Sequence, residues 1–291
     1  MKIAVLLTCH NRKEKTTAFL RSLAGQTYSR DCELDIFLND DGSEDGTKEA
    51  VLNLKGILNN VGMELYIVEG SGYDYWCGGM RRAWCAALEH ESGSCRYSYF
   101  LWANDDVILE NYAVSELLKI CNDKACSPVG VVCGCFKDPE TGVLTYGGRD
   151  DRRLLIPNGR PQKCRYIHGN TVLVPRGTFD LIGNFDSRWT HGFGDSDYGL
   201  CCIEKGLNCW TTSRYIGTCR QHRITAPWFS SEIPLLERIA LARKPVGGNF
   251  REYVQFRRKH YPVRWGFDVL KFIVEVIVPL PFEIYQRIRG E

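Results

Sequence analysis

Three clusters of acidic and amide side chains dominate this sequence, and the first two follow directly on short apolar runs. The apolar runs are residues 34–38 and 99–103, and the clusters are residues 39–43, 104–106 and 194–197. Short apolar runs of this kind are typical of buried strands in a parallel sheet. The carboxyl ends of such strands meet at one edge, where open α/β folds bind ligands. The sequence therefore predicts one site for a cation, a phosphorylated ligand and a proton acceptor.

Apolar residues at helical spacing separate the predicted strands of the N-terminal half. The predicted elements there are strands over residues 3–7, 34–38, 64–68 and 99–103, with helices over residues 15–23, 47–58 and 80–88. This alternation favours a mostly parallel sheet with right-handed crossovers. Further strands are predicted over residues 129–135 and 171–174. The expected fold class is α/β, with a Rossmann-like, mostly parallel sheet flanked by helices.

The bulk properties of the chain exclude several classes of protein. Its 291 residues suffice for one large α/β domain with an appendage. A net charge of +2 gives no indication of a nucleic-acid partner. The N-terminus has only five consecutive apolar residues, too few for a signal peptide, so a cytoplasmic location is expected. The 14 cysteines include no Cys-x-x-Cys pair, and we interpret most of them as buried, reduced side chains.

Two segments near the N-terminus together resemble a known family. Residues 5–12 read Val-Leu-Leu-Thr-Cys-His-Asn-Arg, and residues 39–47 read Asn-Asp-Asp-Gly-Ser-Glu-Asp-Gly-Thr. In this combination they are similar to the inverting family 2 glycosyltransferases, over roughly residues 1–225. The resemblance implies the GT-A fold and a nucleotide-diphosphate sugar as donor.

The loop after the first predicted strand and Asp40 lie at neighbouring strand ends, and together they can form a pocket for a nucleotide base. The resemblance implies that Asp40 accepts the N3 proton of uracil with help from Thr8. It places His10 and Arg12 in the same nucleotide site. Asp41 is expected to touch the ribose or to cap the turn. Taken alone, this aspartate indicates only a turn that caps the next helix.

The second cluster stands where the family has its Asp-x-Asp metal motif, with Asn104 in the first acidic position. Asp106 is the expected ligand of a divalent cation, Mn²⁺ or Mg²⁺, because such ions prefer hard oxygen ligands. Asp105 is expected to support that ligand or to contact the donor. The resemblance also implies that His222 completes the metal shell, although a lone histidine is more often an ordinary polar residue. The alternative for the cluster is a strand end that caps the following segment.

The third cluster and the residues before it resemble the acidic motif ahead of the family's last core helix. Their sequence is similar to that of rhamnosyl- and galactofuranosyltransferase-like members. The resemblance implies that Asp195 is the base that deprotonates the acceptor hydroxyl. Asp197 fits acceptor contact or helix capping, and His191 and Trp76 are expected on the acceptor side. Arg81 fits either neutralisation of the diphosphate or a solvated helix start.

Residues 226–291 are predicted to form a C-terminal helical extension, and residues 1–225 the glycosyltransferase domain. A basic stretch, residues 257–264, precedes an apolar run, residues 267–280, which charged residues interrupt. The run falls short of the ~20 clean apolar residues that span a bilayer. Two interpretations stay open: an interfacial membrane anchor, or a helix packed on the core or on another subunit.

These expectations combine into one functional hypothesis. The chain is expected to be a metal-dependent inverting glycosyltransferase with a UDP- or dTDP-sugar donor and a saccharide or lipid-linked saccharide acceptor. The basic and apolar C-terminal stretch would suit a lipid-linked acceptor in bacterial surface polysaccharide synthesis, at the inner face of the cell membrane. Two alternatives stay open, a sugar-phosphate nucleotidyltransferase and a non-catalytic carbohydrate-binding scaffold with the same fold. The first should carry a Gly-rich phosphate loop after its first strand, and residues 8–12 hold none.

Overall fold

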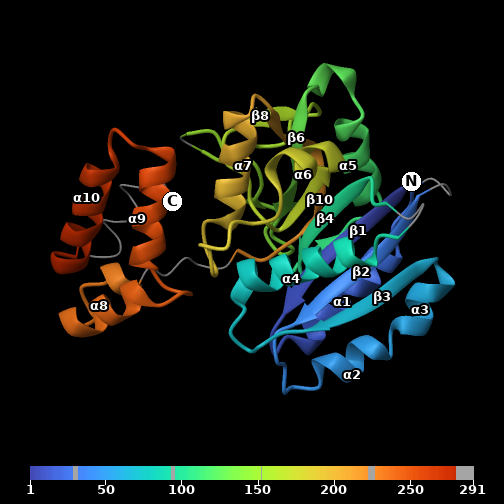
Figure 1. Cartoon of the computed structure of the whole chain (residues 1–291), viewed down its shortest axis with the longest axis horizontal. Helices are drawn as coiled ribbons and strands as arrows, with labels where there is room; N and C mark the ends of the chain where they lie inside the picture. Colours follow the sequence, from blue (N-terminus) through green and yellow to red (C-terminus); the bar gives the residue numbers. More distant parts are fainter. Residues whose placement is uncertain (29–31, 93–95, 152, 222–226, 280–291) are drawn as a thin grey trace. The chain divides into compact units, whose positions relative to one another are not determined.

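The computed structural model describes residues 1–28, 32–92, 96–151, 153–221 and 227–279 (Figure 1). The chain forms two compact units. The first unit contains Met1–Asp186 and Gly194–Gln221, and the second contains Ser187–Phe193 and His222–Glu291. The domain boundary predicted between residues 225 and 226 lies outside the described residues.

The first unit is built around one sheet, in which neighbouring strands follow the order β3-β2-β1-β4-β9-β6-β10-β5, with β7 paired to β6 and β8 to β10. The strands are β1 (Lys2–Cys9), β2 (Glu33–Asp40), β3 (Met63–Glu69), β4 (Tyr99–Asn104), β5 (Ile108–Leu109), β6 (Val129–Lys137), β7 (Leu144–Tyr146), β8 (Gln162–Cys164), β9 (Thr171–Pro175) and β10 (Asn208–Thr218). The part β3-β2-β1-β4 is parallel, as predicted. Strand β9 is antiparallel to both β4 and β6, so the second half of the sheet is mixed.

Helices cover both faces of this sheet, which confirms the α/β fold class (Figure 1). They are α1 (Lys13–Ala24), α2 (Thr47–Leu52), α3 (Lys55–Asn60), α4 (Tyr75–His90), α5 (Ala113–Cys121), α6 (Arg176–Ile182) and α7 (Gly194–Glu204). The helix predicted over residues 47–58 is instead two short helices, α2 and α3. Asn53, a poor helix former, lies at the break.

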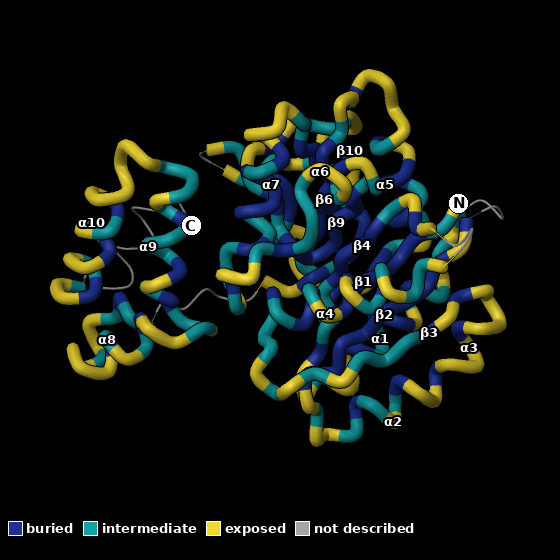
Figure 2. The backbone as a smooth tube through the Cα atoms, in the orientation of Figure 1, coloured by how far each residue is buried: buried dark blue, intermediate teal, exposed yellow. Residues whose placement is uncertain are grey.

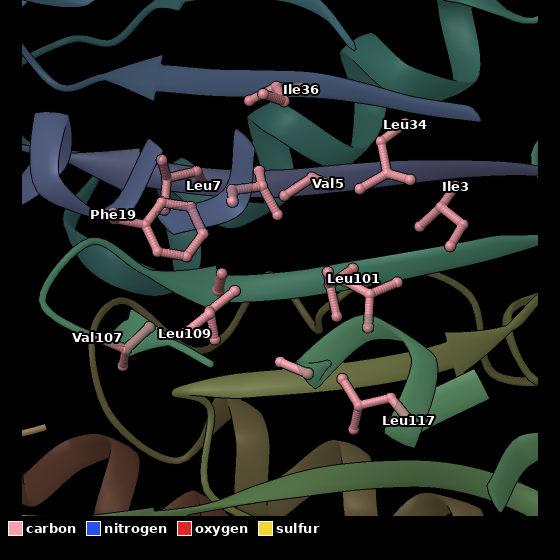
Figure 3. Close-up of a cluster of buried hydrophobic side chains, with 14 of the residues drawn as sticks. Ile3, Val5, Leu7, Phe19, Leu34, Ile36, Leu101, Val107, Leu109 and Leu117 are labelled. Carbon is pink, nitrogen blue, oxygen red and sulfur yellow. The ribbon is translucent and has the colours of Figure 1, made fainter. Parts of the chain in front are cut away.

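The position of strand β1 in the middle of the sheet, with both faces buried, explains why its sequence is a continuous apolar run. Its side chains alternate between the two faces of the sheet, and both faces are covered. On one face, Val5 belongs to the same buried cluster as Phe19 of α1 and Leu117 of α5 (Figure 3). On the other face, Ala4 and Leu6 are buried in a cluster that includes side chains of α4. A strand that is buried on both faces has no polar alternation.

The cysteines act mainly as small apolar side chains. Most of the described cysteines are buried, and each of them is a free thiol. Burial raises the pKa of Cys135 to about 11, so this thiol stays protonated at neutral pH.

Helix α4 comes very close to the end of β1 at Gly79. A Cβ atom at this position would lie 2.1 Å from Thr8 Oγ1 and 2.8 Å from Asn39 Nδ2. We expect Gly79→Ala to lower the free energy of unfolding by about 1–3 kcal/mol, because the helix or the strand end has to move. Urea unfolding measures the change. Gly56→Ala in α3 is the control, since nothing lies within 4 Å of its Cβ position. An equal loss of stability in both variants would contradict the steric explanation.

In the second unit, the described residues 227–279 contain the helices α8 (Leu235–Arg243), α9 (Phe250–His260) and α10 (Trp265–Ile277). Its small buried core consists of Phe229, Ala242, Phe272 and Val276. The segment Ser187–Phe193 joins this unit through Thr190, whose hydroxyl donates to Glu252 Oε1 at 2.6 Å. Among the described residues, no helix is long and apolar enough to cross a membrane.

Candidate active site

Three parallel strands of the first unit end side by side at residues that the sequence pattern indicated. Thr8 of β1 pairs in register with Asn39 of β2 and with Asn104 of β4. Asp40 is the last residue of β2, and two aspartates follow β4 directly. The strand ends therefore form the carboxyl edge of the parallel part of the sheet, which is the edge that binds ligands in open α/β proteins.

Asp40 and Thr8 lie on adjoining strand ends, and each is held by a neighbour. The carboxylate of Asp40 is buried, and its Oδ1 accepts a hydrogen bond from the backbone N–H of Ser43 at 3.0 Å. The Thr8 hydroxyl oxygen accepts from Asn39 Nδ2 at 3.3 Å. Asn11 joins the two loops, because its backbone N–H donates to Ser43 Oγ at 2.9 Å. The two loops are thus joined at the carboxyl edge of the sheet, where the base pocket is predicted.

Asp41 is held in place by the N-terminus of α4. Its Oδ1 accepts from the backbone N–H of Gly72 at 2.7 Å, and its Oδ2 accepts from Asp74 at 3.0 Å and from Tyr75 at 3.1 Å. Tyr75 is the first residue of α4, so the carboxylate caps that helix. The backbone oxygen of Asp41 lies 2.6 Å from His10 Nδ1. The geometry supports the capping role, although the capped helix is α4 and not the next helix in the chain.

Arg12 connects the first loop to the second cluster. Its Nη1 lies 2.9 Å from Asp105 Oδ1, and its Nη2 lies 2.6 Å from Asp106 Oδ2. Thr16 Oγ1 donates to Asp105 Oδ2 at 3.0 Å. Burial raises the pKa of Asp105 to about 6, against the opposing effect of Arg12. The end of β4 therefore brings together two carboxylates and one guanidinium, with Asp105 the more deeply buried carboxylate.

Both ends of the Asn104 side chain are hydrogen-bonded. Its Oδ1 accepts from Trp76 Nε1 at 2.7 Å, and its Nδ2 donates to Asn170 Oδ1 at 2.8 Å. These bonds fix the indole of Trp76 beside the end of β4. Arg81 lies five residues further along α4, and its Nη1 donates to the backbone oxygen of Asp186 at 3.0 Å. Asn104 therefore positions its neighbours, while the carboxylates of the cluster lie on the two residues that follow.

Asp195 lies in the first turn of α7, half-buried. Its Oδ2 accepts from the backbone N–H of Gly169 at 2.9 Å, and its Oδ1 accepts from Ser196 at 2.6 Å. A Cβ at Gly169 would lie 2.7 Å from the indole of Trp76. Gly169, in the loop before β9, thus lies between the indole of Trp76 and the carboxylate of Asp195, and there is no room for a side chain at this position. Asp195 is consequently close to the side chains at the end of β4.

The remaining predicted site residues lie in α7, in the second unit or outside the described residues. Asp197 is buried in the same turn of α7 as Asp195. His191 is exposed and belongs to the segment Ser187–Phe193 of the second unit. His222, the predicted metal ligand, lies outside the described residues.

The sequence pattern missed His168 and Asn170, which flank Gly169 at the start of β9. The Nδ1 atom of His168 is buried and has no hydrogen-bond partner among the described residues, and neither has Nδ2 of Asn170. Burial lowers the pKa of His168, while the nearby carboxylates of Asp195 and Asp106 act in the opposite direction. The lowered pKa favours the neutral imidazole at pH 7. Buried polar atoms without partners are rare, and a catalytic role or a bound water or ion is among their explanations.

An antiparallel strand brings these residues to the site. Thr171 of β9 pairs with Ala103 of β4, and the two strands run in opposite directions. The start of β9 therefore lies at the edge where β4 ends. In the sequence these residues are a His-Gly-Asn run directly before an apolar strand. The run could have been assigned to the site only if the direction of that strand had been known.

Solved structures resemble the chain, whereas no protein-family model and no curated protein matches it. A mannosyltransferase from Pyrobaculum calidifontis in complex with GDP-Man and Mn²⁺ has a TM-score of 0.56 at 18% identity, over 78% of this chain and 59% of that one. S. aureus TarS 1–349 in complex with UDP-GlcNAc has a TM-score of 0.56 at 13% identity, over 95% and 82%. GalNAc-T7 with UDP, GalNAc and Mn²⁺ has a TM-score of 0.58 at 13% identity, over 98% and 56%.

The chain has the GT-A fold. All three similar structures are nucleotide-sugar glycosyltransferases, so the predicted fold is confirmed. The chain spans 59% of the length of the mannosyltransferase and 56% of the length of GalNAc-T7. At these identities the similarity establishes the fold alone, and the activity has to be argued from the side chains at the strand ends.

Proposed function

We propose that this protein is an inverting glycosyltransferase of the family 2 type, which moves a sugar from a nucleotide-diphosphate donor to an acceptor hydroxyl. One observation carries the proposal: the loop before β9 links a half-buried carboxylate, Asp195, to the carboxylates at the end of β4. Gly169 donates to Asp195 Oδ2 at 2.9 Å, and the next residue, Asn170, accepts at Oδ1 from Asn104 Nδ2 at 2.8 Å. A base and a charged diphosphate site beside each other are what sugar transfer from such a donor requires.

Asp195 is proposed as the base. Two backbone N–H groups orient its carboxylate, one from the residue that follows it and one from Gly169. Each carboxylate oxygen has a second lone pair with which it can accept the proton of an acceptor hydroxyl. The hydroxyl oxygen then attacks the anomeric carbon from the face opposite the nucleotide, which inverts the configuration there. Trp76 and Asp197, together with His191, are proposed on the acceptor side.

The nucleotide is proposed to bind between the loops that follow β1 and β2. Asp40 is buried at the end of β2, and a buried carboxylate there suits the N3–H donor of uracil or thymine. Thr8 is its neighbour across the strand pair. A UDP- or dTDP-sugar is therefore the proposed donor. His10, Asp41 and Arg81 complete the proposed nucleotide site, with Asp41 acting through its cap on α4.

The end of β4 fits a divalent cation, because its carboxylate oxygens are the hard ligands that Mn²⁺ and Mg²⁺ prefer. Asp106 would hold the ion, with Asp105 behind it and His222 as a further proposed ligand. The bound ion would neutralise negative charge on the leaving diphosphate. Arg12 already places a guanidinium 2.6 Å from Asp106, so the chain itself supplies positive charge at the same point.

The acceptor is proposed to be a saccharide or a lipid-linked saccharide in bacterial surface polysaccharide synthesis, reached from the cytoplasmic face of the membrane. The basic and apolar sequence between residues 257 and 279 supports this assignment.

A panel of nucleotide sugars tests the proposed function. We expect the intact protein to release nucleotide from a UDP- or dTDP-sugar, to lose this activity in chelator, and to regain it with added Mn²⁺ or Mg²⁺. Nucleotide release is followed by a coupled assay, and the anomeric configuration of the product by NMR. A retained configuration would contradict inversion. Formation of a nucleotide sugar from a sugar phosphate and a nucleoside triphosphate would instead identify a nucleotidyltransferase.

A further inference from the structure

The second unit contains an apolar pocket that the proposed transfer reaction does not use. The pocket has a volume of about 230 Å³. Its walls are Ile239, Ala242 and Arg243 of α8, Phe250 of α9, and Phe272, Ile273, Val276 and Ile277 of α10. All but one of these side chains are hydrocarbon. A space of this size is smaller than the pockets of about 300–1,000 Å³ that hold drug-sized ligands, and it offers a sugar or a nucleotide almost no hydrogen-bonding group.

An exposed apolar face of α10 adjoins the wall of the pocket. Phe267, Leu270, Val274 and Ile277 recur every three or four residues along this helix, with exposed fractions between 49% and 67%. Figure 2 shows buried and exposed residues alternating along α10. Ile277 belongs both to this face and to the wall of the pocket. An apolar chain that enters the pocket would therefore pass over an apolar surface and not over a polar rim.

A buried positive charge lies beside the pocket. Arg238 is only 6% exposed, and its guanidinium donates to the backbone oxygens of Ser230 at 3.1 Å and Ile277 at 3.4 Å. Its Nε has no hydrogen-bond partner, and no carboxylate of the described residues pairs with it. A buried charge without a counter-ion is costly, which makes an anion at this point favourable. Arg243 adds an exposed guanidinium to the pocket wall.

The net charge of residues 227–279, the described helical part of the second unit, matches such a ligand. Residues 227–279 include nine Lys and Arg residues and five Asp and Glu residues, a net charge of +4, whereas the whole chain carries +2. Positive charge beside an apolar face is the combination that binds an anionic amphiphile at a membrane surface.

We infer that this pocket binds the hydrocarbon chain of a single-chain amphiphile with a phosphate head, drawn from a membrane, with the phosphate near Arg238 and Arg243. The identification of this amphiphile with the lipid part of the acceptor rests on the proposed function. The binding itself does not, because every residue that carries it lies in the second unit.

Calorimetry on the full chain with alkyl phosphates below their micelle concentration tests the inference without any donor. Affinity for octyl, decyl and dodecyl phosphate should rise roughly fourfold for each added methylene until the pocket is full. Inorganic phosphate, which has the head without the chain, should not bind measurably. A neutral alkyl glucoside of equal chain length should bind about tenfold more weakly than the phosphate, because it lacks the charge-assisted contact.

Substitutions locate the site. Ile273→Ser and Arg243→Glu each change an exposed residue of the pocket wall, and each should weaken dodecyl phosphate about tenfold or more. Leu236→Ser and Arg251→Glu are the matched controls, because both residues are exposed on helices of the same unit but do not line the pocket. Equal losses in the wall variants and the controls would overturn the inference. So would an affinity that does not depend on chain length.

One further outcome would overturn it. The chain's own C-terminal residues could occupy the pocket and compete with the alkyl phosphate. In that case dodecyl phosphate should bind only after Leu280 and Phe282 are both replaced by serine. Turnover of nucleotide sugars is measured on the same samples. Loss of alkyl phosphate binding with normal turnover would remove only this inference, whereas normal binding without any turnover would remove only the proposed function.

Discussion

Asp195→Asn should reduce sugar transfer by about 10²–10⁴-fold while donor binding survives, because the change removes the proposed base and keeps the size of the side chain. The asparagine retains one oxygen for the backbone N–H groups of Gly169 and Ser196, so one of these two bonds is lost. Turnover and calorimetric donor affinity, measured on one preparation, separate the chemical step from binding.

Asp197→Asn is the matched control for this experiment, because it changes a second carboxylate in the same turn of α7. Transfer should be affected far less there than in Asp195→Asn, and the thermal unfolding midpoint of each variant shows whether the helix start is intact. Near-normal turnover of Asp195→Asn, with a large loss in Asp197→Asn, would move the base to Asp197.

Asp106→Ala should abolish the metal-dependent part of nucleotide binding. Loss of a group that only supports a metal ligand costs about 10–100-fold in metal affinity, so the loss of the ligand itself should cost at least as much. Arg12 would keep its second partner, Asp105, at 2.9 Å, which should limit the damage to the fold. Titration of nucleoside diphosphate in Mn²⁺ and in chelator measures the difference.

Asp180→Ala is the control for this substitution, because Asp180 is an exposed aspartate on α6 that pairs with Arg176 and Arg96. Its binding curves should match those of the unchanged protein. Full transfer activity in chelator would contradict the assignment of the metal to Asp106. Arg12 would then be the group that offsets the charge of the diphosphate.

The positions of the parallel strands were predictable from short-range patterns. The runs over residues 3–7, 34–38 and 99–103 are apolar throughout because both faces of these strands are covered, and each lies inside an observed strand. The clusters that contain Asp40 and Asp106 lie at the carboxyl ends of two of these strands. Their arrival at a common edge is a consequence of parallel pairing, since connections that cross back over the sheet let successive strands run in the same direction.

The antiparallel strand β9 could not be predicted in the same way. A five-residue apolar run has no feature that tells its direction, so the pattern of Thr171–Pro175 fits a strand that leaves the site or one that enters it. Its actual direction brings His168, Gly169 and Asn170 beside Asp195, in place of the residues that follow β9. The roles of individual polar groups also depended on the neighbours that folding supplies. Asp41 and Asn104 proved to be engaged by backbone and side-chain partners from α4.

By itself the sequence determined the fold class, the order of strands and helices up to the end of β4 apart from the break between α2 and α3, and the carboxylates that could carry chemistry. These features depend on local propensity and on burial, which a single chain records in its apolar spacing. Only the tertiary structure decided which carboxylates are engaged by Arg12, which residue stands between Asp195 and Trp76, and that the second unit has an apolar pocket beside a buried arginine. The physical reason is that such contacts join residues tens of positions apart, and their free energy depends on distances and directions that the folded backbone sets.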